Sequence, residues 1–243
     1  MESIIDHYMR GFGPRRPGLA KNVYLLYNLP MKKLTKKHKL AMVERLAAAY
    51  GDMDSALHFS SVWQLLVAVV LSAQTNDNQV NRITQTLFAD YPDAAALCRL
   101  TPEQLEPLIA TCGLYKNKAK NLIATAHLIH EQYQDQVPAD KALLVTLPGV
   151  GTKSANVILS VGFGLPALAV DTHVFRVSNR MGLAAAKTVE QTEAQLCALI
   201  PRENWAKAHH WLIWHGRRCC TARKPDCGSC PAGDLCPSYL GNL

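Results

Sequence analysis

The amino-acid sequence predicts an all-α fold. Hydrophobic residues recur at helical spacing through most of the chain after about residue 39, and start and stop signals bound these segments. No stretch shows the sustained alternation of polar and apolar residues that is typical of a strand between two turns. With 243 residues, 49% of them hydrophobic, the chain can form one large domain or two modest ones around a buried core.

The first two predicted helices lie between residues 39 and 73. Residues 39–50 place four apolar side chains on one helical face before Gly51 ends the segment, namely Leu40, Val43, Leu46 and Ala47. The second helix begins after Ser60 and Ser61, whose hydroxyl groups can cap it, and runs through Ala73. Because this helix is apolar nearly all round, we expect it at the centre of the fold.

Two further helices have clear local signals. The sequence Thr101-Pro102-Glu103-Gln104 is a strong helix start, because proline stands at the first helical position, where its missing N–H costs nothing. Residues 118–133 form an amphipathic helical pattern. We therefore expect helices joined by short connections.

Composition excludes several classes of protein. Charged residues make up 19% of the chain beside 49% hydrophobic residues, which excludes a disordered protein. The longest apolar stretch, Leu65 to Ala73, is too short to cross a membrane. Residues 1–30 lack the apolar core of a secretory signal. Eight cysteines without such a signal predict a reducing compartment such as the cytoplasm, where clustered thiols bind metal more often than they form disulfides.

The net charge of +7 resides in residues 1–40. This segment holds nine lysines and arginines against two acidic side chains, whereas residues 41–243 carry equal numbers of basic and acidic side chains. A basic arm on a neutral body predicts an anionic partner, and nucleic acid is the first candidate. A solvated leader, or a segment that packs on the body through residues 24–27, is the alternative.

Residues 147–156, with the sequence LPGVGTKSAN, are the first segment with candidate binding and catalytic groups. Pro148 ends the preceding segment, and Gly149 and Gly151 permit a tight turn with positive φ before a helix opens at Thr152. Free N–H groups at that helix start can hold a phosphate without regard to base sequence. Lys153 can contact a phosphate or act as an amine nucleophile, and its own segment leaves both roles open.

An aspartate follows in the next segment of the chain. Asp171 comes after a Gly-Leu-Pro turn at residues 164–166 and can cap a helix over residues 172–181. A structural cap accounts for it, yet a catalytic role is compatible with capping, because a cap carboxylate is held rigidly at the start of its helix.

Together these two segments resemble the helix-hairpin-helix glycosylases with their Gly-Pro-Asp loop, and the chain from Phe59 to Cys236 resembles the endonuclease III family. The resemblance implies a DNA glycosylase with abasic-site (AP) lyase activity, in which Lys153 matches the nucleophile and Asp171 the essential carboxylate. Such an amine attacks the sugar C1′ and forms a Schiff base, which makes β-elimination feasible. The chain departs from the family pattern by about 35 additional residues before the first shared helix, to which the family motifs assign no role.

Four cysteines near the end of the chain are spaced C-x6-C-x2-C-x5-C: Cys220, Cys227, Cys230 and Cys236. Four thiolates so close in sequence can enclose an iron–sulfur cluster or zinc, but zinc ribbons usually pair two C-x2-C steps and this pattern has one. The resemblance implies a [4Fe–4S] cluster on these four cysteines, and we interpret Cys219 as a non-ligand. Three nearby histidines are predicted to pack or to lie at the surface rather than to complete a mixed zinc site: His209, His210 and His215.

Six further residues are predicted to contact DNA: Gln74, Leu114, Gly149, Gly151, Arg223 and Lys224. The two glycines belong to the hairpin. By resemblance, the glutamine and the leucine enter the duplex beside the extruded base, and Arg223 and Lys224 lie on the DNA backbone from a loop tethered between two cysteines.

The sequence thus predicts two helical domains that flank a DNA-binding cleft. A six-helix domain over 57–165 contains the hairpin, a discontinuous domain over 41–56 and 166–243 contains the cluster, and residues 1–40 form a basic extension. The predicted function is removal of oxidised pyrimidines from double-stranded DNA, with cleavage of the abasic site, by a monomer associated with the nucleoid through DNA. The alternatives are a monofunctional or mismatch-directed glycosylase of the same superfamily and a non-catalytic iron–sulfur DNA-binding protein.

Overall fold

The computed structural model describes residues 34–51 and 53–241. These ranges are helical and contain no strand, which confirms the predicted all-α fold, and none of their helices is long and apolar enough to cross a membrane. The α-helices are α3 (Lys36–Tyr50), α4 (Val62–Leu71), α5 (Asp77–Asp90), α6 (Ala94–Leu97), α7 (Pro102–Leu105), α8 (Tyr115–Tyr133), α9 (Lys141–Leu144), α10 (Thr152–Val157), α11 (Thr172–Arg180), α12 (Val189–Leu199), α13 (Trp205–Arg218) and α14 (Pro237–Leu240). Single 3-10 turns cover Glu106–Ile109, Arg202–Asn204 and Gly233–Leu235, and a π-helical turn, Ile158–Gly162, continues α10.

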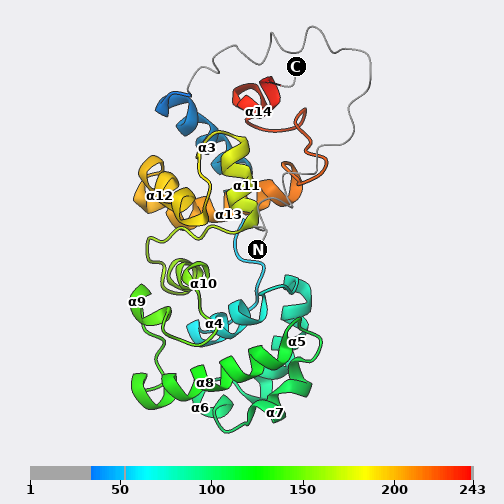
Figure 1. Cartoon of the computed structure of the whole chain (residues 1–243), viewed down its shortest axis with the longest axis vertical. Helices are drawn as coiled ribbons and strands as arrows, with labels where there is room; N and C mark the ends of the chain where they lie inside the picture. Colours follow the sequence, from blue (N-terminus) through cyan, green and yellow to red (C-terminus); the bar gives the residue numbers. More distant parts are fainter. Residues whose placement is uncertain (1–33, 52, 242–243) are drawn as a thin grey trace.

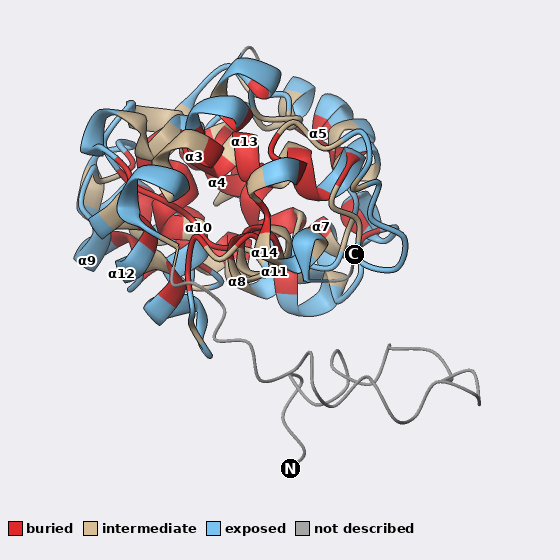
Figure 2. Ribbon diagram, turned by 90° about the horizontal axis from the view of Figure 1, so that it is seen from above, coloured by how far each residue is buried: buried red, intermediate tan, exposed pale blue. Residues whose placement is uncertain are grey.

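Two groups of helices each enclose a hydrophobic core (Figure 1). Helices α4 to α10 surround the first core, and α3 with α11 to α14 surrounds the second. Figure 2, viewed from above, shows the buried residues gathered in the interior and the exposed residues on the outside. The division into domains at residues 57 and 165 stays a prediction, which these two cores support.

Helix α4 occupies the centre of the first core, as its sequence predicts. Eight of its ten residues are buried. The Ser61 hydroxyl caps the helix by accepting a hydrogen bond from the Gln64 N–H. The helix ends at Leu71, two residues earlier than predicted, and the chain then turns toward the pocket described below.

Capping explains where other helices differ from the predicted boundaries. Helix α3 begins at Lys36 instead of residue 39, because the Thr35 hydroxyl accepts from the His38 N–H. The predicted start at Thr101 is confirmed, with a reciprocal capping box between Thr101 and Gln104. That helix nevertheless gives way to a 3-10 turn at Glu106, since Pro107 has no N–H to continue the α-helical pattern.

The predicted basic extension lies mostly outside the described residues. Residues 1–33 are not described, so the expectation that they contact nucleic acid stays a prediction. Residues 36–40 belong to α3, and the Lys39 ammonium donates to the Leu183 carbonyl at 3.1 Å. Leu34 packs against the second core, and the boundary at residue 40 stays a prediction.

Candidate active site and cysteine cluster

The glycine-rich hairpin joins α9 to α10 and is fastened to α8. Gly149 has a φ of +81°, and a Cβ there would come within 3.2 Å of the Asn121 side chain, so the turn requires glycine. Gly151 is extended, with a φ of −91°, as the N-cap of α10, so positive φ is confirmed only at Gly149. A Cβ on Gly151 would meet no atom within 4 Å, which leaves its backbone open to close approach. The Thr125 hydroxyl donates to the Pro148 carbonyl at 3.0 Å and holds the hairpin in place.

Lys153 and Asp171 line one pocket although they come from different helices. Lys153 is the second residue of α10, a helix that contributes Ala155 to the first core. Asp171 precedes α11, which contributes Val174 to the second core. The pocket therefore lies where the two cores meet, and its lining is Asp54, Ser55, Ala56, Leu57, Val69, Ser72, Asp77, Lys153, Val157, Asp171, His209, His210, Ile213, Trp214 and Arg217.

Asp171 is the N-cap of α11, as predicted. Its Oδ1 accepts a hydrogen bond from the Val174 N–H at 2.8 Å. This bond places the carboxylate at the positive end of the helix dipole and fixes its orientation. A rigidly held carboxylate on the pocket wall can stabilise positive charge without reorganising first.

Two histidines of α13 complete one side of the pocket. His209 is buried and donates from Nδ1 to the Ala169 carbonyl at 2.8 Å, so it fastens the chain two residues before Asp171. Burial is the main cause that lowers the pKa of His209 to about 4, and the adjacent His210 ring is the second. The side chain is therefore neutral near pH 7. Burial also lowers the pKa of His210, whose Nε2 lies 3.5 Å from Asp54 Oδ1. His209 thus packs, as predicted, but its position beside Asp171 is not indicated by the sequence.

An ion pair spans the pocket between the two groups of helices. Arg217 of α13 donates from Nη2 to Oδ2 of Asp77, the first residue of α5, at 2.8 Å. The Arg217 guanidinium also lies 5.4 Å from the centre of the Trp214 ring, and the Trp214 indole N–H donates to the Asp54 carbonyl at 3.2 Å. No local signal could reveal these pairs, because Asp77 and Arg217 are 140 residues apart in sequence.

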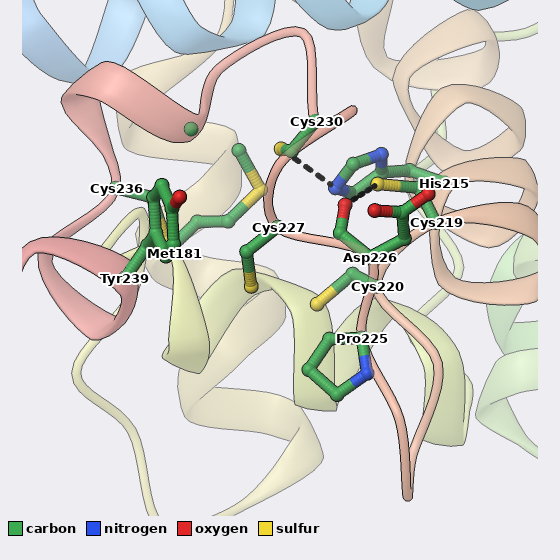
Figure 3. A pocket seen from close by; sticks show the side chains of 11 residues that line it. Met181, His215, Cys219, Cys220, Pro225, Asp226, Cys227, Cys230, Cys236 and Tyr239 are labelled. Atoms are coloured by element: carbon green, nitrogen blue, oxygen red, sulfur yellow. Dashed lines mark hydrogen bonds between the residues drawn. The ribbon is translucent and has the colours of Figure 1, made fainter. Parts of the chain in front are cut away.

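The four predicted cluster ligands gather around a second pocket (Figure 3). Cys220, Cys227, Cys230 and Cys236 line it together with Cys219, His215 and apolar side chains that include Met181 and Pro225. The Cys219 Sγ donates a hydrogen bond to the Asp226 carbonyl at 3.1 Å. His215 is fully buried, with Nδ1 3.2 Å from the Tyr50 hydroxyl and Nε2 3.7 Å from the Cys230 Sγ.

A different group of possible metal ligands overlaps this set. Among the described residues, one ligand atom each of His215, Cys219 and Cys230 lies within 4.8 Å of the others. This group contains only one of the four predicted ligands. The two sets therefore predict different ions, an iron–sulfur cluster for four thiolates and zinc for a mixed histidine–cysteine site.

Helix α11 connects the two pockets. Its first turn is capped by Asp171, and its later turns carry two arginines that hold the chain around Cys220. Arg176 Nη2 donates to the Gly216 and Cys220 carbonyls at 2.9 and 3.1 Å. Arg180 donates to the carbonyls of Thr221 and Ala222 at 2.6 and 2.8 Å. The candidate carboxylate and the start of the cysteine loop are thus positioned by one rigid element.

The six predicted DNA-contact residues are exposed and fall on four loops. Gln74 and Leu114 have positive φ values, +56° and +59°, and their loops touch, because the Gly113 N–H donates to Thr75 Oγ1 at 3.3 Å. Arg223 and Lys224 lie between the first two cysteines, where the Thr221 hydroxyl donates to the Lys224 carbonyl at 2.6 Å. The structure describes these surfaces without DNA, so the contacts themselves stay predictions.

Comparison with known proteins agrees with this architecture. Residues 67–202 match the family model described as HhH-GPD superfamily base excision DNA repair protein. Endonuclease III of Escherichia coli is 46% identical over 203 residues, which cover 84% of this chain and 96% of that protein. Endonuclease III of Bacillus subtilis is 45% identical over 202 residues, which cover 81% of this chain and 92% of that protein.

Solved structures show the same fold. A trapped covalent intermediate of an endonuclease III with DNA superposes with a TM-score of 0.82 at 40% identity, covering 86% of this chain and 99% of that chain. A thermostable thymine-DNA glycosylase, at 22% identity and a TM-score of 0.76, shares the fold. The chain therefore belongs to the HhH-GPD superfamily of base excision DNA repair proteins, as a DNA glycosylase and AP lyase of the endonuclease III type.

Proposed function

We propose that this protein removes oxidised pyrimidines from double-stranded DNA and cleaves the resulting abasic site through a Schiff base on Lys153. One observation carries the assignment of residues: the Lys153 amine and the Asp171 carboxylate, held by different helices, line a single pocket. An amine and a fixed carboxylate in one pocket are what excision and β-elimination at a deoxyribose require.

Lys153 performs covalent catalysis in this proposal. Its neutral Nζ attacks C1′ of the extruded nucleotide, the C1′–N glycosidic bond breaks, and the base leaves with its bonding electrons and takes up a proton. Ring opening and loss of a proton from nitrogen give a protonated imine between Nζ and C1′. The imine acidifies the C2′ hydrogen, and removal of that proton expels the 3′ phosphate by β-elimination.

Asp171 supports this sequence electrostatically. The carboxylate stabilises the positive charge that develops on the sugar as the glycosidic bond lengthens, and it can accept and return protons. Its cap bond to the Val174 N–H and the His209 bond to the Ala169 carbonyl hold it in position.

Three surfaces would hold the duplex around this pocket. The hairpin would present the backbone at Gly151, where a Cβ would meet no atom within 4 Å, to a phosphate, and such a contact binds DNA without base specificity. Gln74 and Leu114 would fill the space that the extruded base leaves, and wedging side chains offset part of the unstacking cost. Arg223 and Lys224 would contact the backbone from the cysteine loop.

Cys220, Cys227, Cys230 and Cys236 would hold a [4Fe–4S] cluster. The donor set fits, because four thiols converge on one pocket whose other walls are largely apolar, a combination typical of cysteine-ligated clusters. Such a cluster supplies a redox-active centre and a cross-link between distant parts of its loop. The Cys219 hydrogen bond to the Asp226 carbonyl supports its exclusion from the ligands.

The cluster assignment predicts a coloured protein. The purified chain should be yellow-brown, absorb broadly at about 400 nm and contain about four irons per molecule. Cys227→Ser should lose most of the iron, because it removes one of four ligands, whereas the adjacent-cysteine variant Cys219→Ser should retain it. Metal analysis by emission spectrometry measures both. One zinc per chain and no iron would favour the group of His215, Cys219 and Cys230 instead.

Trapping with borohydride tests the proposed chemistry directly. The wild-type chain, incubated with a duplex that contains one abasic site, should form a covalent adduct when borohydride reduces the imine. A monofunctional glycosylase or a non-catalytic DNA-binding protein forms none, since neither supplies an amine nucleophile. Binding of the duplex without any adduct would therefore favour one of these alternatives.

A further inference from the structure

A buried lysine connects the two loops that carry Gln74 and Leu114. Lys118 lies in the first turn of α8, four residues after Leu114, and only 5% of its surface is exposed. It does not line the pocket that contains Lys153 and Asp171. Lysine is rarely buried unless its charge is paired or hydrogen-bonded, so this position requires a physical explanation.

The ammonium group of Lys118 makes three hydrogen bonds, one for each of its hydrogens. Nζ donates to the Leu71 carbonyl at 2.8 Å, to the Ala73 carbonyl at 2.6 Å and to Thr75 Oγ1 at 3.1 Å. The two carbonyls lie at and just after the C-terminal end of α4, where carbonyl groups lack helical partners and the dipole favours a cation. Burial lowers the pKa of Lys118, but all three acceptors favour its charged form.

These bonds hold the chain on both sides of Gln74, because Ala73 precedes it and Thr75 follows it. The same network reaches the second loop. Thr75 Oγ1 also accepts from the Gly113 N–H at 3.3 Å, and the Lys118 backbone N–H donates to the Leu114 carbonyl at 3.1 Å. One residue thus holds the Gln74 loop with its side chain and the Leu114 loop with its backbone.

Both loops need such support. Gln74 and Leu114 each adopt a left-handed backbone conformation, which residues with a Cβ leave unless the surrounding structure holds them there. Both side chains project into solvent, with 58% of Leu114 exposed, so packing of these side chains does not fix their position. The hydrogen bonds around Lys118 hold the two loops in position instead.

We propose that Lys118 is a positioning residue that fixes Gln74 and Leu114 relative to each other, so that both enter the duplex as the damaged nucleotide leaves it. This inference rests on the proposed function, since it takes the two side chains as the groups that fill the duplex. Loops ordered in advance avoid the entropy cost of ordering them on the DNA. Lys118 therefore acts on extrusion and not on bond breaking.

The variant Lys118→Met tests this role, because methionine keeps an unbranched side chain and removes all three donors. The substrate is a duplex that carries one 5,6-dihydroxy-5,6-dihydrothymine opposite adenine. Single-turnover excision should slow by about 10-fold to 100-fold, because misplaced Gln74 and Leu114 side chains no longer offset part of the free-energy cost of extruding the base. Cleavage at a preformed abasic site needs no base extrusion and should change by less than about threefold. A 2-aminopurine beside the lesion should report slower unstacking.

A double-mutant cycle separates positioning from general structural support. In the Gln74→Ala/Leu114→Ala background, Lys118→Met should slow excision by less than about a further twofold, because the residues through which it acts are already gone. Lys120→Met changes an exposed lysine on the same helix and serves as the matched control. Thr75→Val removes the acceptor that the two loops share and should give the same pattern if Lys118→Met fails to fold, as judged by circular dichroism.

Wild-type excision rates in both Lys118→Met and Thr75→Val would overturn the inference. Equal slowing of excision and of abasic-site cleavage would do so too, as would an undiminished effect in the background without the two wedge side chains. Failure of the proposed function looks different. In that case the wild-type chain itself neither excises the base nor forms a borohydride adduct.

Discussion

Lys153→Ala will form no covalent adduct with an abasic duplex in the presence of borohydride. The methyl group of alanine cannot attack C1′, and no imine exists for borohydride to reduce. We expect the rate of strand cleavage to fall by at least about 1,000-fold, as removal of a covalent nucleophile costs several powers of ten in other enzymes. Gel electrophoresis under denaturing conditions measures both the adduct and the cleaved strand.

Duplex affinity distinguishes a lost nucleophile from a lost binding site. The affinity of Lys153→Ala should stay within about threefold of wild type, because the hairpin offers mainly backbone groups to phosphate. Lys207→Ala removes an exposed lysine that does not line the pocket and should behave as wild type. If Lys153→Ala still traps at the wild-type level, the nucleophile is another amine.

Asp171→Asn will retain the fold and lose most base excision. Asparagine caps helices about as well as aspartate, so the bond to the Val174 N–H survives and the melting temperature should move by less than about 3 °C. The negative charge is gone, however, and we expect single-turnover excision to fall by about 100-fold to 1,000-fold. Calorimetry and an excision assay on the same preparation measure the two effects.

A second substitution separates the cap from the charge. Asp171→Ala removes both, and loss of an N-cap bond costs about 1 kcal/mol, or about 2–4 °C in melting temperature for a chain of this size. Its excision rate should match that of Asp171→Asn if the charge is what catalysis needs. Full activity in Asp171→Asn would reduce Asp171 to a structural cap.

The elements that the sequence predicts depend on residues close together in the chain. A capping hydroxyl at Ser61, a capping box at Thr101 and a cap carboxylate at Asp171 each act within three residues, so their helix starts are confirmed. The cysteine spacing is equally local, and the four cysteines line one pocket. Boundaries were less accurate where a cap lay just outside the hydrophobic pattern, as at Thr35.

Only the tertiary structure brings the two candidate catalytic groups together. Lys153 and Asp171 belong to consecutive helical segments, but helical periodicity does not determine whether their side chains share a pocket. The bonds that shape that pocket join distant residues: His209 reaches back 40 residues to Ala169, and Arg217 reaches 140 residues to Asp77.

The burial of Lys118 likewise cannot be predicted from the residues next to it in the sequence. In the sequence it is one lysine in an amphipathic helix, where a solvated side chain is the ordinary expectation. Its burial follows from the end of α4, which lies 47 residues earlier and presents carbonyl groups that need a donor. The sequence by itself determined the helices, the hairpin and the spacing of the cysteines, because those depend on short-range hydrogen bonds and periodicity. The tertiary structure decided which polar groups meet, because that depends on how separate helices pack.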